Sequence, residues 1–338
     1  DRSSSISRII PHPCSYGVMT GMSQGQTPFR CVGVFGRPQT EGLGAPLRRI
    51  LASIRQQGCA VWVENETAKS AGLTAAESDG QASLNALAER IDLAVILGGD
   101  GTLLGIARQL APTGIALIGV NQGRLGFMTD LDISQVESEL PAVIAGNYVK
   151  EERAMLQVAV MRKAPGSTAR TAVFDAPALN DAVISRGAVS RMVEVEVFVD
   201  GHYLHTLRAD GLIISTPTGS TAYALSALGS ILHPGLAGIT LVPVAPQALS
   251  SRPIVLPEQV EVQVVINDGA GTSLHCDMQA LTSLQDGDKI VVRRGPHKVR
   301  LLHPKGYDYF SMLRRKLHWS TNPLFAGRPD PLPPTETH

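Results

Sequence analysis

Short apolar runs alternate with helical patterns along the first half of the chain. Each run is bounded by glycine or polar residues, which is typical of strands buried in a parallel sheet. The expected strands are 29–36, 60–64, 93–97 and 115–120, and the expected helices are 46–55, 84–90, 103–110 and 134–146, the last with a serine cap at Ser134. This alternation predicts a parallel, Rossmann-like α/β domain over residues 29–147.

Strand patterns dominate from Tyr148 onward. Apolar and polar residues alternate strictly in Val193–Asp200, and Gly201 follows at a turn. The expected strands are 156–161, 193–200, 254–256, 260–266 and 289–293, and Asp286-Gly-Asp288 is an expected hairpin turn. The second half therefore reads as a mainly β domain over residues 148–304.

The two ends of the chain differ from these domains. Residues 1–28 are polar and lack a period, which predicts a disordered extension, and the Pro-rich residues 321–338 predict a loose tail. A helical pattern over Tyr309–Leu317 lies within segment 305–320, which we expect to pack back on the N-terminal domain.

Composition excludes several classes of protein. The formal net charge of +0 argues against a nucleic-acid partner or an anionic membrane surface. No apolar run has the length of a transmembrane helix. The four cysteines lack metal-ligand spacing and predict reduced thiols in a cytoplasmic protein.

The segment Leu93–Thr102 carries the first candidate chemistry. A buried strand ends at the glycine turn Gly98-Gly99-Asp100-Gly101-Thr102, and a helix follows. Glycines and a helix N-terminus let backbone N–H groups approach a phosphate. Asp100 would repel that phosphate, so its carboxylate suits a group that takes a proton from a hydroxyl, holds a ribose or acts through a metal. The alternative is that Asp100 only caps the helix.

Two further segments combine turns with polar groups. Asn121–Met128 follows an expected strand, at the same sheet edge as the glycine turn, or is an ordinary loop with Phe127 as a core residue. Arg208–Ser226 contains an apolar strand, five hydroxyl residues around Pro217 and Gly219, and an expected helix over Ala222–Leu228. Hydroxyl and N–H groups at a helix start can hold phosphate or ribose, or serve as caps. Arg208 and Asp210 would share one strand face, either as ligand contacts or as a surface ion pair.

Other common sites are absent from the sequence. The chain has neither a P-loop nor the dinucleotide fingerprint Gly-x-Gly-x-x-Gly, which weakens an oxidoreductase interpretation. The histidines lack a metal spacing, and Ser220 has no adjacent partner that would mark a nucleophile.

Taken together, the motifs resemble those of the bacterial NAD kinases, from Arg30 to Ser320. The motifs are Gly98–Thr102, Asn121–Phe127, Asn180-Asp181, Asp210–Tyr223, Cys276–Gln279 and Leu302–Lys305 with the segment through Trp319. The glycine motif is shared with diacylglycerol and sphingoid kinases, whereas Thr216–Tyr223 is more selective. The resemblance implies a Rossmann-like domain, a β-sandwich, and transfer of a phosphoryl group from ATP to the 2′-hydroxyl of the adenosine ribose of NAD. It also implies a divalent metal such as Mg²⁺ and a homodimer or homotetramer.

The resemblance also implies roles for single residues. Asp100 would accept the proton of the 2′-hydroxyl, with Gly101 beside the ribose. Asn180 and Asp181 would contact ribose or base. The other residues implied for NAD binding are Phe127, Arg191, Arg208, Asp210, Thr221, Ala222, Tyr223, Ser226, Ala245 and Gln279, and those expected at phosphate are Gly98, Gly99, Gly101 and Thr102. Tyr223 would offer adenine a flat face, and Arg208 and Asp210 would line the nicotinamide side.

Two positions depart from the family pattern. The family usually has Asn-Glu where this chain has Asn180-Asp181, so the carboxylate is shorter by one methylene. Leu228 stands where a second glycine is common. The alternatives to an NAD kinase are a lipid kinase with the same glycine turn and a non-catalytic NAD(P)-binding regulator. ATP against polyphosphate, NAD against NADH, and the metal ligands stay open.

Overall fold

The computed structural model describes residues 27–37, 42–123, 125–164, 166–186 and 192–319. Three expectations lie outside the described residues. They concern residues 1–26 of the expected extension, the tail over 321–338 and the candidate Arg191.

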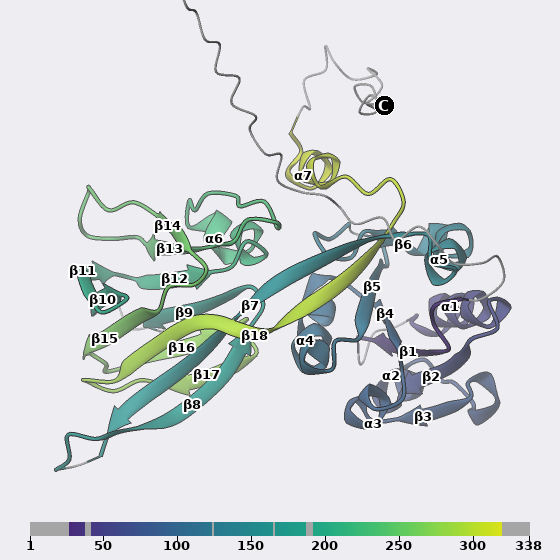
Figure 1. The fold of residues 1–338 in the computed structure, drawn as a ribbon, viewed down its shortest axis with the longest axis horizontal. Coiled ribbons are helices and arrows are strands. Elements are labelled where there is room, and N and C mark those ends of the chain that lie inside the picture. The colour runs from purple at the N-terminus through teal and green to yellow at the C-terminus, as the bar shows by residue number, and fades with distance from the viewer. Residues whose placement is uncertain (1–26, 38–41, 124, 165, 187–191, 320–338) are drawn as a thin grey trace, which may run out of the picture.

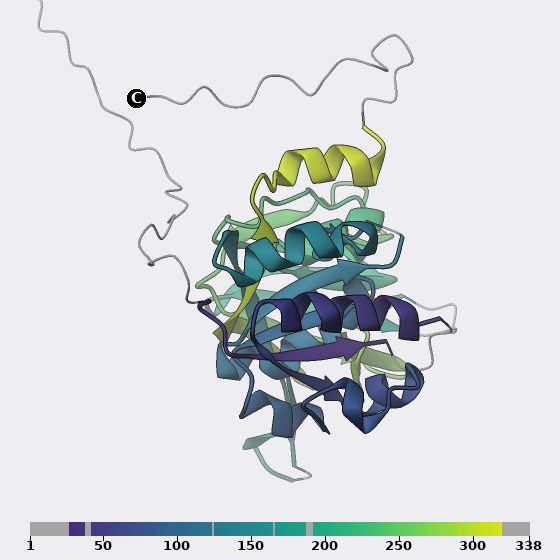
Figure 2. The same ribbon diagram turned by 90° about the vertical axis from the view of Figure 1, so that its right-hand side faces the viewer.

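The N-terminal half is a parallel sheet with helices on both faces, which confirms the Rossmann-like expectation (Figure 1). The strands run in the order β5-β4-β1-β2-β3 and are all parallel. Helices α1 and α5 lie side by side on one face (Figure 2), and α3 and α4 bury their apolar residues on the other. The elements are β1 (Cys31–Gly36), α1 (Gly44–Gln56), β2 (Ala60–Glu64), α2 (Asn65–Ser70), β3 (Gly80–Ala82), α3 (Leu84–Ala88), β4 (Leu93–Leu97), α4 (Asp100–Leu110), β5 (Ala116–Asn121), β6 (Leu131–Asp132) and α5 (Val136–Ile144).

Two helix starts differ from the prediction. Helix α4 begins at Asp100, three residues before the expected Leu103, because its first turn contains glycine and polar residues that hide the helical period. Ser134 is not a cap. The carboxylate of Asp132 accepts a hydrogen bond from the N–H of Ser134, a short 3-10 turn follows, and α5 then begins at Val136.

The C-terminal half consists mainly of strands in two sheets, which confirms the expected mainly β, sandwich-like fold. The apolar core lies between the sheets and draws on strands from both. The elements are β7 (Tyr148–Lys163), β8 (Arg170–Ala178), β9 (Asp181–Arg186), β10 (Val193–Val199), β11 (His202–Ala209), β12 (Gly211–Ser215), α6 (Tyr223–Ser226), β13 (Gly238–Val244), β14 (Ile254–Pro257), β15 (Val262–Asp268), β16 (Thr272–Cys276), β17 (Ala280–Ser283), β18 (Lys289–Pro304) and α7 (Tyr309–Leu317).

Strand β18 belongs to both halves of the molecule. Its first part pairs with β15, and its residues on both sides of a bulge pair with β7. Its end pairs in parallel with β5 through Arg300 and Ala116 (Figure 1). The parallel sheet therefore continues without a break into the β half, as one sheet of 12 strands.

Two expected elements in this half were wrong. Asp286-Gly-Asp288 is a turn but not a hairpin, because β17 belongs to the six-stranded sheet and β18 to the larger one. The turn residues indicate a bend without indicating which strand pairs next. The helix expected over Ala222–Leu228 is the single turn α6 after a 3-10 turn at Gly219–Thr221, and it ends where Leu228 takes a positive φ of 63°.

Candidate functional site

Asp100 is the first residue of α4, and its carboxylate points away from its own helix. It accepts hydrogen bonds from the N–H groups of Phe127 (2.8 Å), Met128 (3.0 Å) and Thr129 (3.2 Å), and from the hydroxyl of Thr129 (3.3 Å). The helix has no side-chain cap, so the interpretation of Asp100 as a cap was wrong. Three of the four bonds go to Oδ1 and only the bond from Phe127 goes to Oδ2, which therefore keeps the capacity to accept another proton donor.

The glycines around Asp100 serve different purposes. A Cβ added to Gly126 would lie far inside van der Waals contact of Asp100 Oδ1, so only glycine allows this loop to approach the carboxylate. At Gly99 and Gly101 a Cβ would meet nothing within 4 Å, so neither glycine is demanded by packing. A Cβ on Gly98 would lie 2.7 Å from the hydroxyl of Thr102, which places Gly98 under the helix start.

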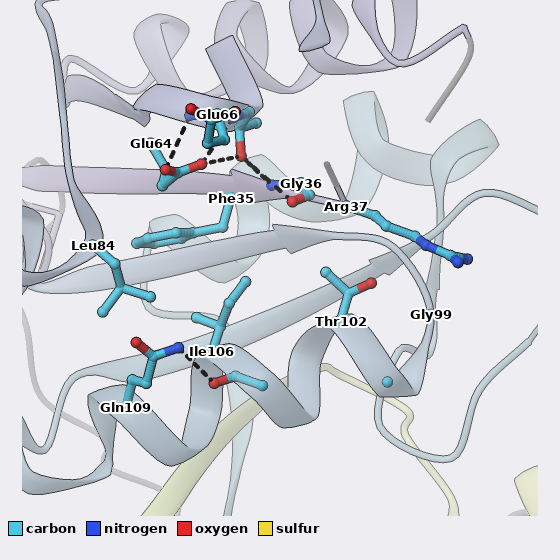
Figure 3. A pocket seen from close by; sticks show the side chains of 13 residues that line it. Phe35, Gly36, Arg37, Glu64, Glu66, Leu84, Gly99, Thr102, Ile106 and Gln109 are labelled. Atoms are coloured by element: carbon cyan, nitrogen blue, oxygen red, sulfur yellow. Dashed lines mark hydrogen bonds between the residues drawn. The ribbon is translucent and has the colours of Figure 1, made fainter. Parts of the chain in front are cut away.

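A cavity of about 680 Å³ opens on the N-terminal side of this turn (Figure 3). Of the residues expected at phosphate, Gly99, Gly101 and Thr102 line it and Gly98 does not. Apolar side chains, two carboxylates and several other polar or small residues complete the lining. They are Phe35, Gly36, Arg37, Glu64, Glu66, Thr67, Leu84, Gly105, Ile106 and Gln109. The cavity lies at the carboxyl ends of β1 and β4, where open α/β sheets bind ligands.

On the other side of the turn, Asp277 organises the candidates Asn180 and Asp181. Its carboxylate accepts hydrogen bonds from the N–H groups of Leu179 (2.7 Å), Asn180 (2.7 Å) and Asp181 (3.0 Å). It also forms an ion pair with Arg108 of α4. Sequence reasoning missed Asp277 and Arg108, although Asp277 stands inside the motif Cys276–Gln279.

Burial and charge shift the pKa values of both carboxyl groups at this turn. Burial first, and the charge of Asp277 second, raise the pKa of Asp181 to about 7. Burial also raises the pKa of Asp277, against the opposing effect of the three N–H groups and Arg108. A carboxyl group that titrates near neutral pH is typical of functional sites.

Gln279 connects this turn to the glycine motif. Its Nε2 donates to the carbonyl of Gly101 at 3.4 Å, and its Oε1 accepts from Arg108 at 3.5 Å. The structure thus brings Asp100, Gly101, Phe127, Asn180 and Gln279 to one junction between the halves of the chain.

The hydroxyl-rich segment lies beside this junction. The hydroxyl of Thr216 donates to the carbonyls of Leu179 (2.5 Å) and Asn180 (3.2 Å), and the hydroxyl of Ser220 donates to the carbonyl of Pro217. Ser220 is therefore structural. Thr221, Ala222, Tyr223 and Ser226 follow in the 3-10 turn and α6, and 43% of Tyr223 is exposed.

Arg208, Asp210 and Ala245 form a separate group at the ends of β11 and β13. Arg208 pairs with Glu194 at 3.4 Å, so the suggested ion pair with Asp210 was wrong. The N–H of Asp210 donates to Val244, next to Ala245, whose φ is +43°. These contacts stay within the β half of the chain.

Helix α7 holds the loop that carries Phe127. The ammonium group of Lys316 lies 5.8 Å from the ring centre of Phe127 and also donates to the carbonyl of Leu125. At the other end of α7, the hydroxyl of Tyr309 donates to Leu232 at 3.4 Å. Lys316 is a second residue that sequence reasoning missed, because a helical lysine gives no signal of its target.

A metal site and a membrane-spanning helix each place requirements on the described residues. Within the described ranges, no group of three His, Cys, Asp or Glu residues could hold a metal ion. No helix in that part of the chain is long and apolar enough to cross a membrane.

Comparisons with known proteins fit this geometry. Residues 32–148 match the family model described as the ATP-NAD kinase N-terminal domain, and residues 179–304 match the C-terminal domain. NAD kinase from Cupriavidus pinatubonensis is 49% identical over 90% of this chain and 96% of its own length. NAD kinase from Ralstonia nicotianae is 48% identical over 92% of this chain and 100% of its own length.

Solved structures with the same fold cover most of the chain. Yeast NADH kinase in complex with NADH has a TM-score of 0.77 and 25% identity, over 88% of this chain and 89% of its own. An NAD kinase from Archaeoglobus fulgidus in complex with ATP has a TM-score of 0.65 and 24% identity, over 86% and 98% of the two chains.

Proposed function

Because the chain belongs to the ATP-NAD kinase family and is an NAD kinase, which makes NADP from NAD and ATP, we propose that Asp100 accepts the proton of the attacking hydroxyl. The observation that carries this proposal is the asymmetry of its hydrogen bonds, since Oδ2 accepts from Phe127 alone. Because the chain belongs to this family, neither alternative, a lipid kinase or a non-catalytic NAD(P)-binding regulator, is needed to explain its motifs.

The loop at Phe127–Thr129 supports this role by fixing the carboxylate. Three N–H groups from consecutive residues hold Asp100 in one orientation, and the helix start holds its backbone. Phosphoryl transfer depends on positioning and charge neutralisation more than on covalent chemistry. A carboxylate fixed in this way can meet the 2′-hydroxyl of the adenosine ribose without reorganising.

The donor nucleotide fits the cavity on the N-terminal side. Open space at Gly99 and Gly101 and the N–H groups of the first turn of α4 favour phosphates there. Phe35, Leu84 and Ile106 offer an apolar wall for a base (Figure 3). This wall favours ATP over polyphosphate, which has no base to bury.

The acceptor dinucleotide fits the opposite side. Gly101 lines the donor cavity, and its carbonyl accepts a hydrogen bond from Gln279 of the β half. The glycine turn therefore borders both the donor cavity and the β half of the chain. Asn180 and Asp181 would hold the ribose or base, and the exposed ring of Tyr223 would stack on adenine. The proposed NAD-binding set is otherwise the one implied by sequence, including Arg208, Asp210 and Ala245.

A divalent metal such as Mg²⁺ fits the donor cavity as an ion held mainly by the phosphates. The carboxylates of Glu64 and Glu66 line the same cavity as Gly99, and oxygen ligands suit Mg²⁺. Glu64 also caps α2, because its carboxylate accepts from the N–H groups of Glu66 and Thr67. When bound, the ion would neutralise charge on the transferring phosphate.

We also propose a cytoplasmic homodimer or homotetramer. The three cysteines in the part of the chain that the structure describes are free thiols, which suits a reducing compartment. Large apolar side chains are exposed, among them Leu249, Met278 and Leu281, which suits association. Light scattering of the purified protein would contradict the oligomer by giving a monomer mass.

The test of the central proposal is NADP formation by Asp100→Asn, read through an NADP-specific dehydrogenase. We expect turnover to fall at least about 100-fold while NAD still binds. Asp92→Asn is the matched control, because Asp92 also accepts backbone N–H bonds, at the other end of β4, and should keep full turnover. Turnover of Asp100→Asn near that of the wild type, or loss of NAD binding together with turnover, would overturn the assignment.

A further inference from the structure

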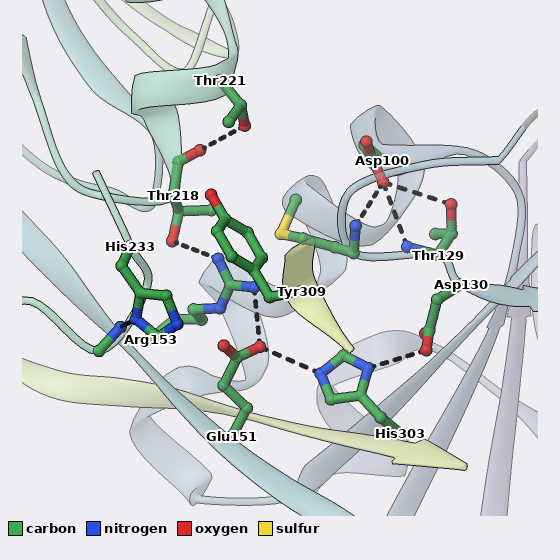
Figure 4. Close-up of polar contacts among 12 residues, drawn as sticks. Asp100, Thr129, Asp130, Glu151, Arg153, Thr218, Thr221, His233, His303 and Tyr309 are labelled. Carbon is green, nitrogen blue, oxygen red and sulfur yellow. Dashed lines mark hydrogen bonds and ion pairs between the residues drawn. The ribbon is translucent and has the colours of Figure 1, made fainter. Parts of the chain in front are cut away.

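Four side chains of alternating charge, two of them buried and two mostly buried, form a row between the two halves of the molecule (Figure 4). His303, at the end of β18, is 1% exposed. Its Nδ1 lies 3.1 Å from Asp130 Oδ2, and its Nε2 lies 3.1 Å from Glu151 Oε2. The same oxygen of Glu151 pairs with Arg153 at 2.7 Å, and the side chain of Arg153 is 3% exposed.

The two ends of the row reach the two sides of the proposed site. At one end, Asp130 directly follows Thr129, whose N–H and hydroxyl both donate to Asp100. At the other end, Arg153 donates to the hydroxyl of Thr218 at 3.3 Å. The carbonyl of Thr218 accepts from Thr221, the first residue of the proposed adenine surface.

The position of His303 between two carboxylates favours an imidazolium ion. A neutral imidazole has one N–H and one lone pair, so one of its nitrogens would turn a lone pair toward a carboxylate oxygen at 3.1 Å. The charged ring turns an N–H toward each carboxylate: Nε2 donates to Glu151, whereas Nδ1 forms an ion pair with Asp130 without the angle of a hydrogen bond. With His303 protonated, the two carboxylates, His303 and Arg153 sum to zero charge, whereas a neutral ring leaves a buried negative charge unpaired.

The pKa values agree with this geometry. Burial lowers the pKa of His303, but the two carboxylates of Asp130 and Glu151 outweigh it and raise the pKa above its usual value. Burial raises the pKa of Glu151, but His303 and Arg153 outweigh it and bring the value to about 2. The carboxylate of Glu151 is thus charged throughout the working pH range.

The other titratable groups that face this row come from neighbouring segments. The ring of Tyr307 stacks on His303 with centres 3.9 Å apart, and burial raises the pKa of its hydroxyl. Burial raises the pKa of Tyr309 in α7, and the charges of Arg153 and Glu151 shift this pKa in opposite directions. Glu139 of α5 lines the cavity that Asp130 and Tyr307 share. Because burial raises the pKa values of both tyrosines, we expect His303 to lose its proton before either of them as the solution becomes alkaline.

We propose that His303 is a positioning residue whose imidazolium holds Asp130 and Glu151 together, and so fixes the Asp100 loop against the Thr218 segment. The proposal rests on the proposed role of Asp100. Loss of the proton turns one attraction into a repulsion and releases the loop that orients the Asp100 carboxylate. Displacement of a catalytic group by about 1 Å costs on the order of 100-fold in rate, so the effect falls on kcat.

The pH profile of kcat for NADP formation tests this. The wild type should lose activity on the alkaline side as one proton leaves. Asp130→Asn removes one of the two carboxylates that hold the proton, and should move this alkaline limb at least about one pH unit lower. His303→Gln should lower kcat about 10- to 100-fold, with a smaller change in KM, and remove the limb. His297→Gln, an exposed histidine on the same strand, is the control and should match the wild type.

A second measurement reads the proton directly. The ring signals of His303, assigned by their absence in His303→Gln, should show an imidazolium at neutral pH in NMR spectra of the whole enzyme. A neutral ring at that pH, an alkaline limb that Asp130→Asn does not move, or kcat of folded His303→Gln within twofold of the wild type would each overturn the inference. The Asp100→Asn variant separates this failure from that of the proposed function, because it tests the role of Asp100 in a protein whose His303 is intact.

Discussion

Arg108 Nε lies 3.4 Å from Asp277 Oδ2, and these two side chains join the helix that starts at Asp100 to the turn that holds Asn180. The carboxylate of Asp277 has no exposed surface and the side chain of Arg108 is 10% exposed. A buried pair of this kind costs desolvation, and its value lies in fixing one arrangement of the two segments. The donor and acceptor sides of the proposed site are thus held in place by groups that need not touch a substrate.

We expect Asp277→Asn to lower the free energy of unfolding by about 3–5 kcal/mol, because it leaves Arg108 buried without a counterion. The amide also cannot accept from all three N–H groups that Asp277 serves. Urea unfolding measures the loss. Glu137→Gln, which breaks the exposed pair with Arg49, should be indistinguishable from the wild type. An equal loss in the two variants would contradict the prediction.

Asp181 should make the protein less stable as the pH rises. Its pKa is about 7 in the folded protein, against about 3.9 in an unfolded chain, so the folded state keeps a proton that the unfolded chain loses between these values. Each unit of difference corresponds to about 1.4 kcal/mol. Asp181→Asn should therefore exceed the wild type in stability most clearly above about pH 7, with the gap closing toward about pH 4. Unfolding measured across this range checks the sign, and a gap that widens in acid would refute it.

Gly101→Ala should separate folding from activity. The added methyl group meets no atom within 4 Å, and alanine favours a helix over glycine by up to about 1 kcal/mol. The melting temperature should thus hold or rise. The methyl group projects into the space proposed for phosphate, where loss of one charged hydrogen bond raises the KM for ATP about tenfold or more. An unchanged KM for ATP would place the phosphates elsewhere.

Lys316→Met keeps an unbranched apolar side chain and removes the ammonium group. The contact of the ammonium group with the ring of Phe127 is worth about 0.5–1 kcal/mol, and the bond to the carbonyl of Leu125 is lost as well. We expect a several-fold fall in kcat and faster proteolysis at the loop that contains Leu125. Arg315→Met, one position earlier in α7, should cause neither change.

Periodicity predicted the elements with simple surroundings. Strand β2 and helix α7 have the expected bounds, because β2 alternates buried and half-buried residues and α7 carries one apolar face. Strand β18 extends 11 residues past the expected end at Arg293, through a bulge and charged positions that break the pattern. Its partners, β15 in one half and β5 in the other, are set by tertiary contacts that no local pattern contains.

In the candidate site, too, the sequence predicted what depends on local pattern and missed what depends on tertiary contacts. Motifs identified Asp100 and Asn180, since their neighbours in sequence carry the signal. They gave no role to Arg108, or to Asp277, His303 and Lys316, which stand inside matching segments, because the partners of these residues lie far away in the chain. A long-range ion pair appears in the sequence only as two separate charges.

Because Ala116 pairs with Arg300, the edge of β5 stays without this partner strand until the ribosome has made β18. At about 5–20 residues per second, a ribosome needs on the order of 10–40 s after β5 to deliver the strand that covers its edge. During that interval the nascent parallel sheet presents unpaired backbone groups at an apolar strand, which is an aggregation hazard. We expect nascent chains arrested before β18 to bind chaperones, and those released after α7 to escape them.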